Sequence, residues 1–193
     1  MSTAPIDYLL SRRSVKFVQA PAPSDADLAR ILQAGMSAPD HGKLQPWRFK
    51  LIRGEAIARL MELVFAASER AGRPVAAEKI ASNRAWLGKV PLLIALACRI
   101  DHSNTKIPEH ERMLAVGAAV TNMLNAAHML GYGAYWSTGL GTYVDEVNEA
   151  LGFDGLDYRF LGYLAMGTPV RASEPAVRPD HKAFVSEWTG SEI

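Results

Sequence analysis

The sequence predicts an α+β fold, with a mixed sheet of four or five strands flanked by helices. Three observations lead to this prediction. Several segments repeat apolar residues at helical spacing, whereas others are short and alternating or wholly apolar, as strands are. Strands and helices do not alternate in the regular manner of a doubly wound parallel sheet. The run Leu92–Arg99 is nearly all apolar, which is typical of a central strand covered on both faces.

The first half of the chain predicts four helices and one strand. Ser24 has good N-cap chemistry and opens a helix whose apolar positions recur at helical spacing. Gly72 and Pro74 separate two later helices. The predicted elements are helices over Ile6–Arg12, 24–36, Ala56–Glu69 and Val75–Gly88 and a strand over Arg48–Arg53, with Leu28, Ile31, Leu32 and Met36 as the buried face of the second helix.

The second half is organised around a long helix, Glu109–Leu130, that is rich in alanine and glycine. Small residues let neighbouring backbones approach closely, so this helix is predicted to be buried all round. The Pro-rich tail from Val170 to Pro179 is predicted to be extended, and either hangs loose or embraces a second subunit. The other predicted elements are strands over Leu92–Arg99, Ala134–Thr138, Phe160–Met166 and Ala183–Trp188 and a helix over Val144–Leu151.

Bulk properties limit the class of protein. A chain of 193 residues fits a single domain over residues 1–193, and 49% hydrophobic with 21% charged residues is ordinary for a globular protein. A net charge of +1 gives no reason to expect nucleic acid or an acidic membrane as a partner. The longest apolar run, Val90–Cys98, is far shorter than the ~20 residues of a membrane span. With one cysteine, Cys98, and no visible secretory signal, a cytoplasmic location is expected.

Several common catalytic signatures are absent from the sequence. The pairs that begin at Gly131 and Gly139 lack the third glycine of a dinucleotide-binding loop, and there is no Walker A sequence. His110 and Glu111 begin a zinc-helix motif, but position 114 is leucine. There is no Gly-x-Ser-x-Gly elbow, and Cys98 lies in an apolar strand where thiols are usually inert. We therefore expect neither a metal site nor a covalent nucleophile.

Two polar segments remain as candidates for a binding site. Arg12, Arg13 and Ser14 combine two guanidinium forks and a hydroxyl, a set suited to a phosphate. The loop 38–47 is dense in hydrogen-bonding groups, and its prolines and glycine keep it out of a helix. Each feature has a simpler interpretation alone: the arginines as a solvated face or as partners of a helix dipole, His41 as a loop histidine, Trp47 and Trp136 as core aromatics and Ser137–Thr138 as a turn.

The combination of segments resembles the nitroreductase family of flavin enzymes, in particular its minimal NAD(P)H nitroreductase subgroup. The segments Ser11–Ser14, Gly35–His41, Gln45–Phe49, Gly131–Trp136 and Phe160–Pro169 stand in the order and spacing of that family. The resemblance implies an α+β fold and an obligate homodimer with one FMN at each of two sites shared between the subunits. It also implies that the alanine-rich helix lies in the dimer core and that the C-terminal arm is exchanged.

The resemblance implies three groups of FMN-binding residues. The first holds the phosphate and ribityl chain, the second approaches the flavin from the other subunit, and the third lines the isoalloxazine. In that order they are Arg12, Arg13 and Ser14; Ser37, His41 and Gln45; and Trp136, Ser137 and Thr138. Some relatives have arginine where this chain has Ser37 and Ser137. Either phosphate binding is weaker here, or the task falls to Arg178 or Lys182 in the tail.

The implied activity is a ping-pong cycle in which NADPH or NADH reduces the flavin and a nitroaromatic, quinone-like or related small acceptor reoxidises it. No catalytic side chain is implied, and solvent can supply the protons. Lys43 is either a donor to the reduced flavin or a solvated loop lysine, and substrate choice would rest on residues 69–89 and 101–111. Two alternatives stay open: a flavoenzyme of this fold that oxidises or dehalogenates a substrate, and a non-enzymatic flavin-binding protein.

Overall fold

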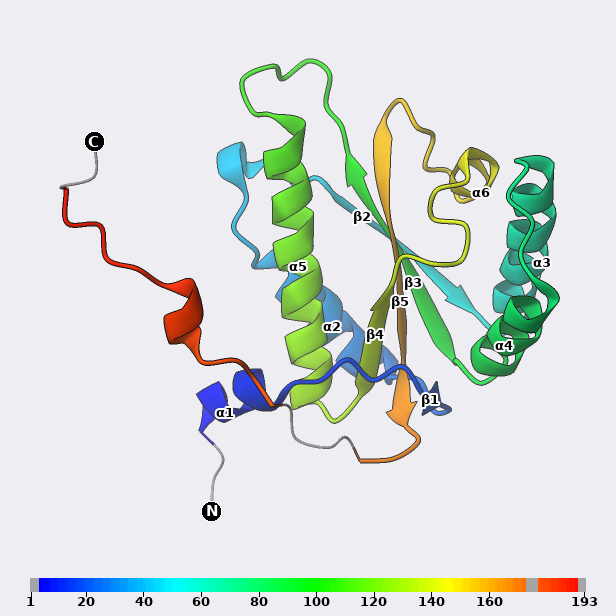
Figure 1. Cartoon of the computed structure of the whole chain (residues 1–193), viewed down its shortest axis with the longest axis horizontal. Helices are drawn as coiled ribbons and strands as arrows, with labels where there is room; N and C mark the ends of the chain where they lie inside the picture. Colours follow the sequence, from blue (N-terminus) through cyan, green and yellow to red (C-terminus); the bar gives the residue numbers. More distant parts are fainter. Residues whose placement is uncertain (1–3, 173–176, 191–193) are drawn as a thin grey trace.

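A computed structural model gives the fold of this chain and describes residues 4–172 and 177–190. The helices are α1 (Pro5–Ser11), α2 (Asp25–Met36), α3 (Glu55–Arg70), α4 (Ala77–Leu87), α5 (Glu109–Met129) and α6 (Asp145–Ala150); short 3-10 turns are η1 (His41–Lys43) and η2 (His181–Phe184); and the strands are β1 (Val18–Gln19), β2 (Trp47–Arg53), β3 (Leu92–Arg99), β4 (Gly133–Ser137) and β5 (Tyr158–Pro169). In Figure 1, α2 and α5 lie on one side of the sheet, and α3, α4 and α6 lie on the other. The α+β class and the flanking helices are as predicted.

The sheet of the described residues has five strands, and β5 pairs with three of the others. Along the main path the order is β1-β5-β3-β2, and β4 also pairs with β5. Every described pairing is antiparallel, so the sheet expected to be mixed is antiparallel within one chain. Its fifth strand is β1, where Val18 pairs with Pro169. Two residues are too few to give a periodic signal, which is why the sequence did not predict β1.

The core consists of two apolar clusters, one on each face of the sheet. All residues of β3 from Leu92 to Cys98 are buried, which confirms the predicted central strand. Because side chains alternate along a strand, Leu93 packs with the α3 and α6 residues, and Ile94 packs with those of α2 and α5. The helices therefore cover both faces, as the continuous apolar run required.

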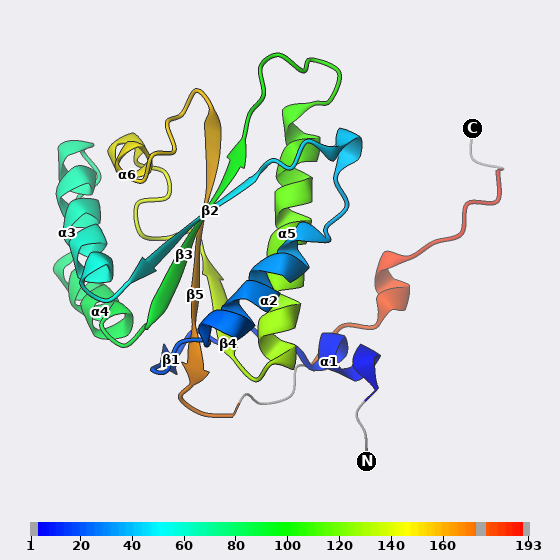
Figure 2. The same cartoon turned by 180° about the vertical axis from the view of Figure 1, so that it is seen from behind.

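The helix α5 departs from the prediction on one side. Val116, Val120 and Met123 are fully buried, but Leu114 is 69% exposed, so the expectation that this helix is buried all round is wrong for the single chain. The sheet and α2 cover only part of its circumference, as Figure 2 shows from behind. No helix within the described ranges, this one included, has the length and apolar character needed to cross a membrane.

The described part of the tail, residues 177–190, lies beside α1 and apart from the sheet (Figure 1). The strand predicted over Ala183–Trp188 is absent from this chain, where η2 and irregular backbone take its place. A strand forms only when a neighbouring strand pairs with it, and among the described residues no sheet edge adjoins the tail (Figure 1). Phe184 and Trp188 are consequently 73% and 80% exposed.

Candidate functional site

The predicted phosphate group, Arg12–Ser14, connects α1 to the first strand and is tied down at both ends. Before it, the Ser11 hydroxyl is hydrogen-bonded to Nε2 of His128 on α5 at 3.1 Å. After it, the amide of Val15 donates to the carbonyl of Ala134 on β4 at 2.9 Å. These two bonds place the segment between the C-terminal end of α5 and the start of β4.

The tail brings another cation to this segment. Arg12, Arg13 and Ser14 line a cavity of about 310 Å³ together with Val177 and Arg178. Nη2 of Arg178 donates to the carbonyl of Arg12 at 2.6 Å. Of the two tail cations that the sequence left open, Arg178 lines the cavity. Lys182 lies in η2, where its backbone amide donates to the capping carboxylate of Asp180.

Positive charge in this cluster is not balanced by acids. Burial, and secondly the charge of Arg178, lower the pKa of the Arg12 guanidinium. Nη1 of Arg12 is buried with no hydrogen-bond partner. Within residues 4–172 and 177–190, no carboxylate forms an ion pair with Arg12, Arg13 or Arg178. A cluster with crowded cations and an unsatisfied donor fits an anionic ligand.

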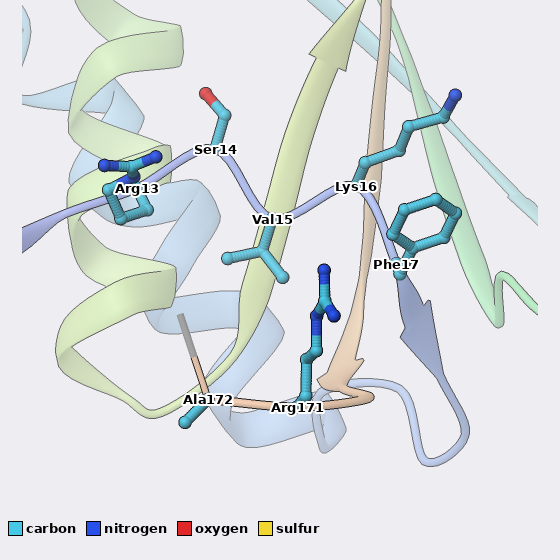
Figure 3. Close-up of a pocket in the computed structure, with 7 residues that line it drawn as sticks. All are labelled: Arg13, Ser14, Val15, Lys16, Phe17, Arg171 and Ala172. Carbon is cyan, nitrogen blue, oxygen red and sulfur yellow. The ribbon is translucent and has the colours of Figure 1, made fainter. Parts of the chain in front are cut away.

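A second cavity of about 340 Å³ adjoins the first, because Arg13 and Ser14 line both. Figure 3 shows the Arg171 side chain rising from the chain after β5 into the space between Val15 and Phe17. Lys16 also lines this cavity. Sequence reasoning missed Lys16 and Arg171, which have no helical or strand periodicity and meet only because β5 ends beside the first strand.

An apolar hollow of about 300 Å³ extends this cavity toward α4. Its walls include the side chains of Phe17, Trp86 and Val170, together with Lys16. The Lys16 ammonium lies 5.0 Å from the centre of the Trp86 ring and 5.7 Å from that of Phe17. The surface beside Arg13 and Ser14 therefore offers cations at one end and aromatic walls at the other, which suits a ligand with a charged and a flat apolar part.

The third predicted group stands at the far end of β4. The Trp136 indole donates to the carbonyl of Leu161 at 2.8 Å, and the half-buried ring packs against the core, in keeping with its simpler interpretation. Ser137 and Thr138 follow it, where a Cβ on Gly162 would lie 2.3 Å from the Ser137 carbonyl oxygen. Glycine at 162 thus lets β4 and β5 approach closely. From Ala134 to Ser137 the strand rises about 10 Å, so one strand connects the first group to the third.

The second predicted group is divided between α2 and η1. Ser37 ends α2, where its hydroxyl donates to the Ala34 carbonyl at 2.7 Å and accepts from Asn122 of α5 at 3.3 Å. Farther on, Nδ1 of His41 is 2.6 Å from the Glu111 carboxylate at the N-terminal end of α5. Gln45 is exposed, and its backbone amide donates to the Asp40 carboxylate at 2.6 Å.

The structure does not bring His41 to Arg12 within one chain. Arg12 lies by His128 and His41 by Glu111, and these two α5 residues are about 25 Å apart at ~1.5 Å of rise per residue. The first and third groups share one side of the molecule through β4. The loop with His41 and Gln45 lies at the opposite end of α5 (Figure 2).

Other reactive chemistry has little support in the described residues. Cys98 is fully buried, and burial raises the pKa of its thiol to about 11, so a thiolate is scarce at neutral pH. No cluster of three or more His, Cys, Asp or Glu side chains suited to a metal occurs among the residues that the structure describes.

Known proteins are similar to this chain in sequence and in fold. Residues 9–168 match the model of the nitroreductase family. The chain is 35% identical over 182 residues to the Escherichia coli (strain K12) protein named "Putative NAD(P)H nitroreductase YdjA", covering 94% of this chain and 97% of that one. A nitroreductase-like family protein from Bacillus cereus superposes with a TM-score of 0.79 at 27% identity, covering 98% of each chain. A Desulfovibrio desulfuricans nitroreductase-type protein solved in complex with FMN superposes with a TM-score of 0.73 at 24% identity, covering 97% of this chain and 98% of that one. This chain belongs to the nitroreductase family.

Proposed function

We propose that this protein is an FMN-dependent NAD(P)H oxidoreductase that reduces nitroaromatic, quinone-like or related small acceptors in a ping-pong cycle. The observation that carries the proposal is the unbalanced cationic cavity of Arg12, Arg13, Ser14 and Arg178 beside a cavity with aromatic walls. Bound FMN would supply the redox chemistry by accepting a hydride from NADPH or NADH and passing electrons to the acceptor.

The residues present fit the proposed cofactor. A phosphate on Arg12, Arg13 and Arg178 would offset their mutual repulsion and give a partner to the unsatisfied Nη1 of Arg12. Ser14 would hydrogen-bond the ribityl chain. The flavin would extend from there along β4 toward Trp136, Ser137 and Thr138. The aromatic hollow would lie beside it, because the Trp86 ring packs edge-on against Tyr135 of β4.

The chain supplies binding and electrostatics in this proposal and no obligatory acid or base. Lys16 and Arg171 add positive charge next to aromatic walls, where they would favour the anionic form of a reduced flavin. Lys16 lies in the chain that would hold the phosphate, whereas Lys43, in η1, would reach the flavin only from the other subunit. Solvent would supply the protons.

We also propose a homodimer of single-domain subunits spanning residues 1–193, with exchanged C-terminal arms. Two copies would bring the loop with His41 and Gln45 of one subunit, together with Ser37, to the cationic cavity of the other. The exposed apolar side chains of α1, α5 and the tail support this arrangement, since they leave large apolar areas in water. The main members of this surface are Ile6, Leu10, Leu114, Met129, Phe184 and Trp188.

The dimer proposal is tested by analytical ultracentrifugation. We expect a dimer that does not dissociate on dilution unless it unfolds, and we expect Leu114→Glu to weaken it by placing a charge on the exposed face of α5. Leu156→Glu, at an equally exposed position after α6, is the matched control and should leave the dimer intact. A folded, monodisperse wild-type monomer would refute the dimer.

We further propose that substrate choice rests on residues 69–89 and 101–111. These segments flank the aromatic hollow and the loop with His41, respectively. We propose a cytoplasmic location as well, because the one cysteine is buried and free, as suits a reducing compartment.

The experiment that tests the function is the visible absorbance spectrum of the purified protein before and after NADPH, and separately NADH, is added without oxygen. A yellow protein that either nicotinamide bleaches within the mixing time, and that a quinone or nitroarene reoxidises, supports the proposal. A yellow protein that neither bleaches contradicts the reductase activity and favours substrate oxidation or flavin storage. A colourless protein that FMN does not turn yellow contradicts the cofactor itself.

A further inference from the structure

The loop Asp40–Gln45 has a backbone that needs support. Gly42, Lys43 and Gln45 have φ values of 73°, 55° and 48°, in the left-handed region that costs free energy for residues other than glycine. Inside the loop, the Asp40 carboxylate accepts from the Gln45 amide at 2.6 Å, and the Asp40 carbonyl accepts from the Lys43 amide at 3.2 Å. Two bonds within an exposed turn leave its shape dependent on what packs against it.

The first outside support is an apolar contact from Ile107. A Cβ built on Gly42 would lie 2.4 Å from Cδ1 of Ile107, so this methyl group occupies the space where any other residue at position 42 would carry its side chain. Ile107 itself is buried. The contact excludes backbone conformations that would move Gly42 toward it.

The second support is Glu111 on the first turn of α5. Its carboxylate lies 2.6 Å from Nδ1 of His41. An ionised carboxylate can only accept, so Nδ1 carries the proton and Nε2 is the nitrogen left free, which fixes both the tautomer and the direction of the ring. Exposed ion pairs alone contribute little to stability, so Glu111 acts together with Ile107 rather than by itself.

The third support, Arg112, makes the other two rigid. It is only 4% exposed, and its guanidinium donates to the carbonyls of Asp101 at 2.8 Å, Asn104 at 2.5 Å and Ile107 at 3.0 Å. A planar fork reaches three carbonyls of one loop at once, which the single ammonium of lysine does not reproduce. Arg112 thereby fixes the segment that carries Ile107.

We infer that residues 101–112 form a clamp that holds the Asp40–Gln45 loop in one shape, with Ile107, Glu111 and Arg112 as positioning residues for the cofactor site. In the proposed dimer, the clamp would fix the shape of a loop through which one subunit contacts the flavin of the other. Only this last step rests on the proposed function. The clamp itself is a statement about contacts within one chain.

Amide hydrogen exchange of the purified protein tests the clamp. Opening of the loop exposes the Lys43 and Gln45 amides, so we expect Glu111→Gln to speed their exchange about fivefold and Arg112→Lys about a hundredfold. The matched control is Glu109→Gln. Glu109 lies one half-turn away on α5 with similar exposure, but its carboxylate binds Arg159 of β5 at 2.6 and 2.9 Å. Unchanged exchange in Arg112→Lys, or equal effects of Glu109→Gln and Glu111→Gln, would overturn the clamp.

Fluorescence titration of FMN with the apoprotein tests the positioning role. If the loop of Arg112→Lys is open most of the time, the apparent FMN dissociation constant should rise about tenfold, in proportion to the fall in the closed fraction. Faster loop exchange with unchanged FMN affinity would overturn the positioning role. A wild-type protein that binds no FMN would refute the proposed function, and in that case the exchange data still decide whether the clamp exists.

Discussion

The two ends of α5 differ in how their charged groups are satisfied. At its C-terminal end, Arg12 and Arg178 crowd together, and a buried nitrogen of Arg12 has no partner. At its N-terminal end, His41 pairs with Glu111, and Asp40 bonds within its own loop. The C-terminal end therefore suits an anionic ligand, whereas the charged groups at the N-terminal end satisfy one another and support the Asp40–Gln45 loop.

A helix dipole alone does not account for the cationic end. Cations at the C-terminus of a helix gain about 0.3–1 kcal/mol each. An unsatisfied buried hydrogen-bonding group costs about 1–3 kcal/mol, and Nη1 of Arg12 is such a group. For Arg12 itself the cost exceeds the gain, so an anion that reaches this guanidinium explains its unsatisfied donor better than the dipole does.

The largest expected effect comes from removing both cations that follow α1. Arg12→Ala with Arg13→Ala should yield protein that is largely free of FMN, because each charged hydrogen bond to phosphate contributes about 1.5–3 kcal/mol and two lost bonds weaken binding at least about a hundredfold. The ratio of flavin absorbance to protein absorbance after purification measures this. The cluster makes no ion pair among the described residues, so the free energy of unfolding of the apoprotein should change little.

A double variant away from the cationic cavity controls for lost positive charge. Arg53→Ala with Arg59→Ala removes two exposed arginines whose ion pairs, with Asp25 and Glu55, are solvated. This control should keep its flavin, since exposed pairs contribute about 0–1 kcal/mol. Normal flavin occupancy in the Arg12/Arg13 variant would contradict the assignment of anion binding to the C-terminal end of α5.

The fold was predictable wherever a local signal is strong. The Ser24 hydroxyl caps α2 by accepting a hydrogen bond from the Asp27 backbone amide, and the apolar run 92–99 forms β3 with the predicted bounds. The predictions failed where the secondary structure of a segment depends on a neighbouring segment that is distant in sequence. Val18–Gln19 is a strand only because β5 passes beside it. Ala183–Trp188 is not a strand because no sheet edge formed by the described residues is near it.

The candidate site divides in the same way. Arg12–Ser14 and the loop with His41 were found from motifs that are contiguous in sequence. Glu111 was noticed only as part of a failed zinc motif and as the end of the 101–111 loop, not as a partner of His41, and Arg171 was not noticed at all. Glu111 meets His41 across 70 positions of sequence, and Arg171 reaches Lys16 through the end of β5. Such contacts leave no periodic pattern, and only the folded chain reveals them.

A smaller effect distinguishes the two cations of the tail. Arg178→Ala should weaken FMN binding about tenfold, the loss of one charge-assisted hydrogen bond, because Arg178 lines the cavity with Arg12 and Arg13. Lys182→Ala is the matched control, from the turn η2, and should change the dissociation constant less than about twofold. Titration of FMN fluorescence gives both values. Equal losses of FMN affinity in the two variants would mean that the tail contributes only its overall positive charge and no direct contact from Arg178.

The smallest expected effect makes His128 a reporter of the anion. Burial, and secondly the charge of Arg12, lower the pKa of this imidazole. Below the ordinary histidine value of about 6.5, the unfolded chain therefore binds more protons than the folded one, and this contribution to stability is lost as pH falls through the window between the two values. A phosphate on Arg12 would offset its positive charge and raise the pKa of His128, so FMN binding near pH 6 should take up protons.

Nuclear magnetic resonance titration of the His128 ring, with and without FMN, measures this shift. Arg12→Ala should raise the pKa of His128 only in part, because burial is the larger cause and remains. In that variant, FMN should no longer move the titration, since the cation that linked the two is gone. If FMN binds the wild-type protein and leaves the His128 titration unmoved, its phosphate lies away from Arg12. The C-terminal end of α5 would then be a solvated cationic surface, and its contrast with the clamped loop at the other end would have no bearing on the cofactor.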